Sequence, residues 1–539
     1  MQLNGMRFGL GTALMFVAIL AAAAALRFVG LGTTPPTVYN DDVVNGLDAL
    51  RTLRSGELEL FYPKNNGREP LFVWLLALTH LALPPSVTAL KLPSAAIGTV
   101  SVALIVPATL ALWRFFGRGD GPETEASQRF ALTAALAAML FLCASYWHIG
   151  FSRVGVRAAL DPFFALLSIW LVIAALDRSR GPLLAILAGV AIGLGVYGYL
   201  GHKFLVLPLA GISLYALWRG GLHSLGRLAL VAGVALIVAS GFVYQLVARP
   251  DALTERLSQV SVFGGVTLDQ PDRLITAIGK TLLNAVRLLV ALIGPGDARP
   301  LYNISEAPHL SQAAAIALVI ALTVAVLGLI RRLPRDATDL LPLDRFDRLG
   351  LFLLLWMLVM IVPAAMTWQG QPSAIRAIGM LPPLMILCGL GAAVMIQGIA
   401  RLLEGRTGLR MLAAVTLAFA AFIQPWHSYV AYFHSQAHLR DDGYSFVADT
   451  NAAAYRFVTD GDRHRKVILS RPCFNNCEFV IGHFLYLAED DLAPYRGQHI
   501  TAPEDLATHA GGDAILFVDK LVIERQDPDL TGFADVVVF

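Results

Sequence analysis

Two adjacent carboxylates, Asp41 and Asp42, follow the first apolar segment of the chain, residues 6–31. An acid so close to hydrocarbon loses hydration energy unless water, a cation or a polar ligand lies nearby, so acids at a membrane boundary usually serve function. Such a carboxylate can accept the proton of an attacking hydroxyl group within hydrogen-bond reach. The alternative is that both aspartates only start a helix over residues 43–56, because Asp is favoured at helix N-termini.

Basic and acidic groups share the loop that contains this pair, residues 32–90. Arg68 and Glu69 stand together before the apolar run that begins at Leu71. A guanidinium group can stabilise the negative charge on a departing phosphate. The loop therefore suits chemistry between a hydroxyl group and a phosphate ester.

A second polar segment, "YWHIGFSRVGVRAALDPFF", contains His148, Arg153, Arg157 and Asp161. The last three recur every four residues, so on a continuous helix they would share a face, and Arg157 could pair with Asp161 as a local salt bridge. The other interpretation is a role at a site, because charges at this depth seldom persist without water or a ligand. Both interpretations stay open at this point.

Further candidates lie between later apolar segments. One group comprises Tyr197, Tyr199, His202 and Lys203, in which the histidine could be an interface residue and the lysine a boundary residue. Arg376 lies in the first turn or two of an expected apolar helix, where it needs the phosphate of a ligand or of a lipid headgroup. Residues 294–310 add more polar side chains, namely Asp297, Arg299, Asn303, Glu306 and His309.

The elements that must position these groups are membrane helices. The chain has 539 residues, of which 56% are hydrophobic and 15% charged, with a mean hydropathy of +0.63. This composition is typical of a polytopic membrane protein. Long apolar runs predict about eleven spans, near residues 6–28, 92–116, 130–147, 163–176, 183–200, 204–217, 228–247, 313–330, 351–366, 375–399 and 411–423.

Lys and Arg gather in alternate connecting loops, which the positive-inside rule places in the cytoplasm. The N-terminus is then cytoplasmic, and all the candidate residues lie outside. The first span is long for a cleaved signal peptide, so we expect an uncleaved anchor. Pro425 is expected to end the last span, followed by an aromatic collar that contains Trp426 and Tyr432.

The chain divides into a transmembrane part, residues 1–430, and a C-terminal part, residues 431–539. Short strand-like runs, "KVILS", "DAILFVD" and "ADVVVF", and a helical "NAAAYRFVTD" predict a small extracytoplasmic α/β domain. Cys473 and Cys477 could form a disulfide there or stay reduced. A net charge of +2 without a basic stripe gives no support for nucleic-acid binding.

The order of several motifs resembles the GT-C superfamily of integral membrane glycosyltransferases, in the branch of protein O-mannosyltransferases and the lipid A aminoarabinose transferase. These motifs are "YNDD", "GREPLFVWLLALTHLAL", "HIGFSRVGVRAALDPFF", "GLGVYGYLGHKFLVLPL" and "PSAIRAIGMLPPL", and the resemblance covers most of residues 1–400. It implies transfer of a sugar from a polyprenyl-phosphate donor to a hydroxyl acceptor at the outer face, usually with inversion at the anomeric carbon. The cytoplasmic (inner) membrane is the expected location.

The resemblance also implies roles for single residues. Asp41 would be the general base with Asp42 as its partner, and Arg68 would take the place of a phosphate-facing lysine. Glu69 stands where relatives have proline. Asp161 falls where oligosaccharyltransferase relatives have acidic metal ligands, but it lacks their paired acids, so a divalent metal stays open.

A transporter or flippase of a lipid-linked substrate is the competing hypothesis. It would explain many helices and buried charge, but transporters commonly show repeated halves and broken helices near the midplane. Here the polar residues concentrate in outward loops instead. No glycine-rich phosphate loop is evident, which argues against a soluble sugar nucleotide as donor.

Overall fold

The structure of the chain is a computed structural model. It describes residues 2–3, 6–7, 9–35, 40–62, 67–118, 122–177, 179–220, 224–248, 260–264, 266, 270–299, 303–332, 344–368, 370–437, 466–470, 499–500, 514–518, 530 and 535–538.

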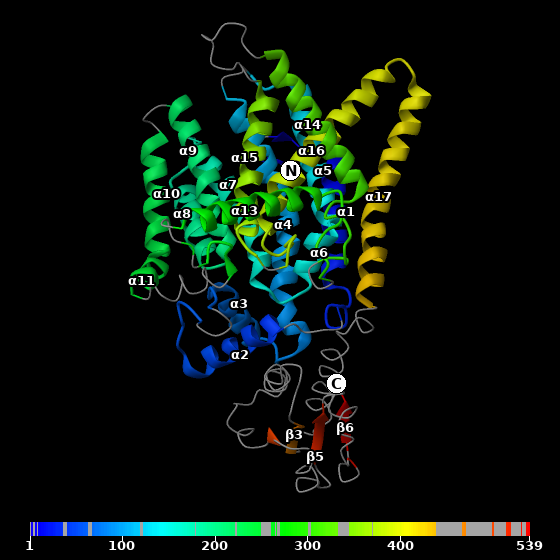
Figure 1. Ribbon diagram of the computed structural model, residues 1–539. Coiled ribbons are helices and arrows are strands. Elements are labelled where there is room, and N and C mark those ends of the chain that lie inside the picture. Colours follow the sequence, from blue (N-terminus) through cyan, green and yellow to red (C-terminus); the bar gives the residue numbers. More distant parts are fainter. Residues whose placement is uncertain are drawn as a thin grey trace.

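Most of the described chain forms a bundle of apolar helices (Figure 1). Eight segments within it are long and apolar enough to cross a membrane. They contain helices α1 (Leu10–Phe28), α4 (Val87–Phe116), α5 (Glu125–Ala144), α7 (Leu160–Ala175), α9 (Val206–Gly220), α15 (Arg345–Ala365), α16 (Leu381–Leu402) and α17 (Thr407–Ala437). Four further apolar helices complete the bundle, namely α3 (Leu71–His80), α8 (Leu183–Val196), α10 (Leu225–Val238) and α14 (Gln312–Arg332).

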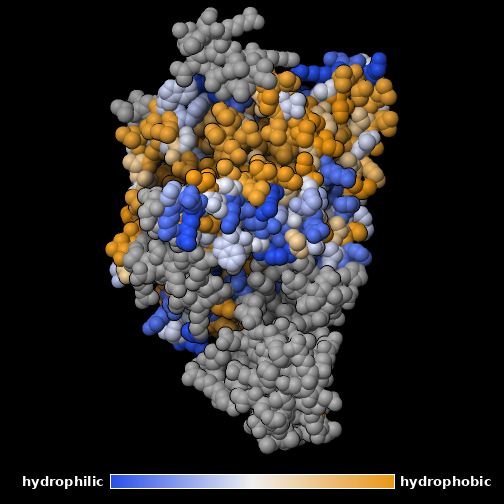
Figure 2. All heavy atoms as spheres, in the orientation of Figure 1, coloured by the Kyte–Doolittle hydropathy of each residue, from blue (hydrophilic) through white to orange (hydrophobic). Residues whose placement is uncertain are grey.

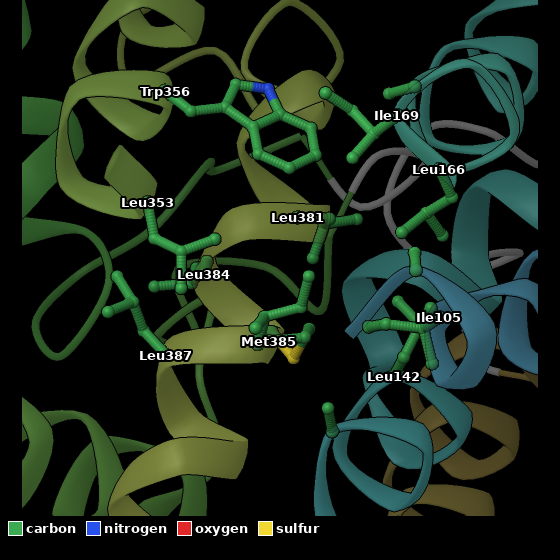
Figure 3. Close-up of a cluster of buried hydrophobic side chains, with 14 of the residues drawn as sticks. Ile105, Leu142, Leu166, Ile169, Leu353, Trp356, Leu381, Leu384, Met385 and Leu387 are labelled. Carbon is green, nitrogen blue, oxygen red and sulfur yellow. The ribbon is translucent and has the colours of Figure 1, made fainter. Parts of the chain in front are cut away.

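Helix α16 lies at the centre of the core. Its Leu381, Leu384 and Met385 face side chains from several other helices, which include Ile105 of α4, Leu142 of α5, Leu166 of α7 and Trp356 of α15 (Figure 3). Small residues permit close approach on its other sides, because a Cβ atom at Gly389 would clash with the carbonyl of Ala134. This packing makes a rigid frame for the polar segments at the helix ends.

Each of the eleven predicted spans overlaps a helix of the structure. The run 228–247 is divided between α10 and a second helix, α11 (Ser240–Ala248). Pro425 does not end the last span as predicted, since α17 continues to Ala437. Membrane helices tolerate proline where other groups satisfy the carbonyl that it leaves free.

The basic connections gather at one end of the bundle, as contacts between them show. Arg345 of α15 pairs with Glu123 at 3.3 Å, and Arg219 of α9 donates to the carbonyl of Arg118 at 2.9 Å. Arg227 of α10 donates to the carbonyl of Arg180 at 2.7 Å. The polar segments that connect the other ends of the spans lie at the opposite end of the bundle, where Figure 1 shows helices α2 and α3.

The C-terminal part is described by four strands, β3 (Lys466–Ser470), β4 (His499–Ile500), β5 (Ala514–Val518) and β6 (Asp535–Val538). They pair in parallel in the order β4-β3-β5-β6. The three predicted strand-like runs coincide with β3, β5 and β6. The predicted helix "NAAAYRFVTD" and the pair Cys473 and Cys477 lie outside the described residues, so the α/β domain stays a prediction. A short pair, β1 (Gln2–Leu3) and β2 (Met6–Arg7), precedes α1.

Candidate active site

The acidic pair lies on a helix that the loop 32–90 was expected to contain. Helix α2 (Asn40–Ser55) begins with Asp41 and Asp42 in its first turn. Their charges meet the positive end of the helix dipole, so the helix-start interpretation is correct as far as it goes. The two acids differ in exposure, because Asp41 is partly exposed and Asp42 is fully buried. Only Asp41 is therefore open to a ligand.

A buried ion pair holds α2 against the following segment. Arg68, fully buried, pairs with Asp48 and donates a second hydrogen bond to Asn45 Oδ1 at 2.5 Å. Tyr62 and Arg68 form an isolated antiparallel bridge, which closes the loop between α2 and α3. Burial lowers the pKa of Arg68, while neighbouring Asp48 raises it. In this geometry Arg68 is a positioning residue for α2, and its predicted contact with a phosphate stays a prediction.

Glu69 joins two cations from distant parts of the chain. One oxygen accepts a hydrogen bond from Lys203 Nζ at 2.9 Å, and the other lies 3.3 Å from Arg157 Nε. All three side chains are largely buried, with exposed fractions of 9% for Glu69, 11% for Arg157 and 21% for Lys203. Two cations share one carboxylate, so this cluster has a surplus positive charge. It can attract an anion.

The predicted helical face of Arg153, Arg157 and Asp161 does not exist. Helix α6 (Tyr146–Ser152) ends before Arg153, and the chain is extended at Val156 before a 3-10 turn, η1 (Arg157–Ala159), starts helix α7. The salt bridge between Arg157 and Asp161 is not formed. Instead Asp161 Oδ1 lies 3.0 Å from Nδ1 of His202, and both side chains are buried.

The predicted metal role of Asp161 stays a prediction. His202 hydrogen-bonds to this carboxylate, and no cluster of three or more His, Cys, Asp or Glu occurs among the described residues. A catalytic zinc usually has three protein ligands, whereas Mg²⁺ can be held by one or two carboxylates together with waters and substrate phosphates. We therefore derive no step through a metal.

Arg153 and His148 contact the end of α1. The Arg153 guanidinium, fully buried, donates to four carbonyl oxygens at 2.8 to 3.0 Å, those of Leu26, Val29, Gly30 and Thr34. Its other face lies 4.5 Å from the Phe433 ring of α17. His148 Nδ1 lies 2.6 Å from the guanidinium of Arg27. The bonds from Arg153 satisfy carbonyls at the end of α1 and just beyond it. His148 instead holds Arg27, in the last turn of α1, so both residues position this helix.

Lys91 and Gly155 fix the depth of the acidic pair. Lys91, fully buried in α4, donates to the carbonyl of Pro35 at 2.8 Å and interacts electrostatically with Asp42. A Cβ atom at Gly155 would lie 3.2 Å from Asp42 Cγ and 2.8 Å from the backbone oxygen of Leu90. A glycine is required there because Asp42 approaches the backbone closely.

Tyr197, Tyr199 and Arg376 lie on two neighbouring segments. Tyr199 donates through its hydroxyl to the carbonyl of Ile375 at 3.3 Å, which places the backbone next to Arg376 beside the aromatic group. Arg376 is partly exposed. Tyr197 donates to the carbonyl of Val238 at 3.1 Å, and its own carbonyl accepts from the backbone of Leu71. Tyr197 thus supports α3, whereas Tyr199 supports the Arg376 segment.

The contributors to the site that were not predicted include Asn45 and Gly155. Asn45 binds Arg68, and Gly155 receives Asp42. A signal for Asn45 exists in the sequence, because Asp42, Asn45, Asp48 and Thr52 recur at helical spacing and are all buried. No comparable pattern identifies Gly155.

Comparisons with protein-family models and with curated protein sequences found no match. Among solved structures, the chain is similar to apo ArnT from Cupriavidus metallidurans, with a TM-score of 0.55 and 12% identity over 97% of this chain and 95% of that one. The structure of ArnT from the same organism bound to undecaprenyl phosphate gives a TM-score of 0.53 and 12% identity, over 98% and 90% of the two chains.

Identity this low shows the fold, and the alignments extend over nearly the whole of both chains. The fold agrees with the apolar helices that are long enough to span a bilayer. This chain is a multi-pass membrane protein with the fold of ArnT.

Proposed function

We propose that this protein is a membrane glycosyltransferase that moves a sugar from a polyprenyl-phosphate donor to a hydroxyl acceptor. The observation that carries the proposal is the arrangement of charges at the start of α2. Asp41, partly exposed, and the cationic cluster around Glu69 lie in one region, since Arg68 interacts electrostatically with both Asp41 and Arg157. The fold shared with ArnT, one structure of which holds undecaprenyl phosphate, supports the choice of donor.

In the proposed reaction Asp41 accepts the proton of the acceptor hydroxyl, whose oxygen attacks the anomeric carbon. The bond from this carbon to the phosphate oxygen breaks, and polyprenyl phosphate leaves with the bonding electrons. Arg157, Lys203 and Arg376 stabilise its developing charge. A single displacement of this kind inverts the anomeric configuration. The donor's prenyl chain would lie among the helices.

Glu69 has a specific part in this scheme. It holds Arg157 and Lys203 together before the donor binds, so that neither long side chain must be ordered at that moment. Asp42 and Lys91 would stay a buried internal pair that fixes Asp41 at the mouth of the site. Asp161 and His202 would support the wall of the site beside Gly379, because a Cβ atom added at Gly379 would lie 2.8 Å from Asp161 Oδ2.

We place the site outside the cytoplasm, in the inner membrane. The basic connections of the bundle lie together at the end opposite to α2, as the positive-inside rule requires of a cytoplasmic end. The N-terminus is then cytoplasmic and the C-terminal part extracytoplasmic. The acceptor arrives from the outer side.

The proposal is tested by incubating the purified protein with a polyprenyl-phosphate donor whose sugar is radiolabelled. Transfer predicts release of free polyprenyl phosphate together with a labelled acceptor product. A flippase would instead move the intact donor between the leaflets of vesicles without releasing the sugar. Movement of intact donor without any release would refute the proposal and favour transport.

A further inference from the structure

Helix α13 (Pro271–Val290) has no part in the proposed reaction. It begins with a proline at its first turn and runs crosswise over the bundle, unlike the spans around it (Figure 1). Hydropathy did not predict this helix as a span, because its sequence mixes charged residues with apolar ones. Its placement therefore needs a separate explanation.

A buried side chain fixes the depth of this helix. The amide nitrogen of Asn284 donates to the carbonyls of Ala365 and Thr367, at 3.0 and 2.9 Å. Ala365 is the last residue of the span α15. Trp368, 56% exposed, follows at the same level, as tryptophans do at bilayer interfaces. Helix α13 therefore crosses the end of a span, where hydrocarbon gives way to headgroups.

Its residues divide into three faces. Ala277, Asn284 and Leu288 are buried against the bundle. The opposite face is apolar and exposed over its whole length, with exposed fractions from 37% to 67% at Ile275, Ile278, Leu282, Val286 and Leu289. A soluble protein would not leave such a stripe uncovered. In a protein of membrane spans, lipid chains cover it.

The third face is a basic row. Arg273, Lys280 and Arg287 recur every seven residues, so they share one side of the helix, and all three are exposed. The ion pairs of the described residues include none of them. Figure 2 shows an apolar band that ends at a row of hydrophilic residues at the level of α13. Asp272 is the only acid in the helix.

We propose that α13 is an in-plane interfacial helix whose basic row binds the phosphates of anionic membrane lipids. The apolar stripe enters the hydrocarbon, while the three cations reach the headgroup layer beside it. Clustered Lys and Arg next to a membrane span are typical of anionic-lipid binding. The row faces the leaflet in which α15 ends, which is the leaflet of the candidate active site.

The test uses the full-length protein in detergent, titrated with phosphatidylglycerol and, separately, with phosphatidylcholine. The wild type should bind the anionic lipid more tightly. The triple variant R273Q/K280Q/R287Q should raise the dissociation constant for phosphatidylglycerol at least tenfold, since each surface charge contributes about fivefold. The matched control R273K/K280R/R287K keeps every charge and should stay within twofold of wild type.

Equal affinity of the wild type for both lipids, or unchanged binding by the glutamine variant, would overturn the proposal. Sedimentation of the same samples addresses the other occupant of the apolar stripe. Suppose that the wild type sediments as a dimer, that the variant I278S/L282S sediments as a monomer, and that the wild type shows no preference for the anionic lipid. This result would assign the apolar stripe to contact with a second copy of the chain. Neither measurement depends on transferase activity, so the proposal can fail while the proposed function stands.

Discussion

The replacement R68M tests whether the ion pair beneath the acidic helix is what holds it in place. Asp48 has two cationic partners of very different burial. Arg68 is fully buried, whereas Arg51, at 2.8 Å, is 46% exposed. Removing one partner of a buried pair costs about 3–5 kcal/mol, and an exposed pair contributes about 0–1 kcal/mol.

We expect R68M at the lower end of the first range, about 3 kcal/mol, because Asp48 keeps Arg51. Asn45 Oδ1 also loses its donor. By the relation of tenfold for every 1.4 kcal/mol, exchange of the α2 backbone amides with solvent should accelerate about a hundredfold. The matched control R51M should change it less than about fivefold.

Hydrogen exchange measured by mass spectrometry on α2 peptides is the assay. The double variant R68M/D48L removes both charges, so its exchange should be slower than that of R68M alone. Equal acceleration by R68M and R51M would refute the reasoning, because the cost would then not come from burial. An R68M protein with normal exchange in α2 but no donor binding would instead make Arg68 a substrate contact.

Three further predictions concern other contacts. G155A should lower transferase activity at least tenfold, because its Cβ atom would press on Asp42 and on the backbone carbonyl of Leu90. The control G150A, whose Cβ atom would make only an ordinary contact at 3.7 Å, should keep its activity. Equal activities of the two variants would contradict this prediction. Burial lowers the pKa of His309 to about 4, below its unfolded value near 6.5, so the unfolded state binds the proton first as the pH falls. The free energy of unfolding should therefore fall by up to about 3 kcal/mol between pH 6.5 and pH 4. Melting curves of wild type and H309Q across this range check it, and an equal slope in both would count against it. E69Q should raise KM for the donor about tenfold with intact folding, and an unchanged KM would remove Glu69 from the donor site.

The spans were predictable because hydropathy reports long apolar runs directly. Helix α3 was missed because ten residues are too few for a span, and α13 because its apolar residues occupy only part of its surface. The end of α17 was misplaced because proline punctuates soluble helices more strongly than membrane helices. Local sequence patterns thus predicted which long apolar segments are helices, but not where every helix ends.

The candidate residues could be found from the sequence, whereas their partners could not. Spacing allowed a pair between Arg157 and Asp161, yet each binds a residue from another part of the chain, Glu69 and His202. A short break after α6 is enough to separate them. Arg153 was predicted as a site residue because a charge at this depth seldom persists without water or a ligand. Only the folded chain brings it to the end of α1.

The most direct measurement of the central claim is the release of polyprenyl phosphate by D41N and D42N, compared with wild type. Both variants keep the shape of the side chain, so both should fold. D41N should lower turnover about a hundredfold or more, as expected for the loss of a general base. D42N should act through the position of Asp41 and reduce turnover less. Wild-type turnover in both variants would contradict the account.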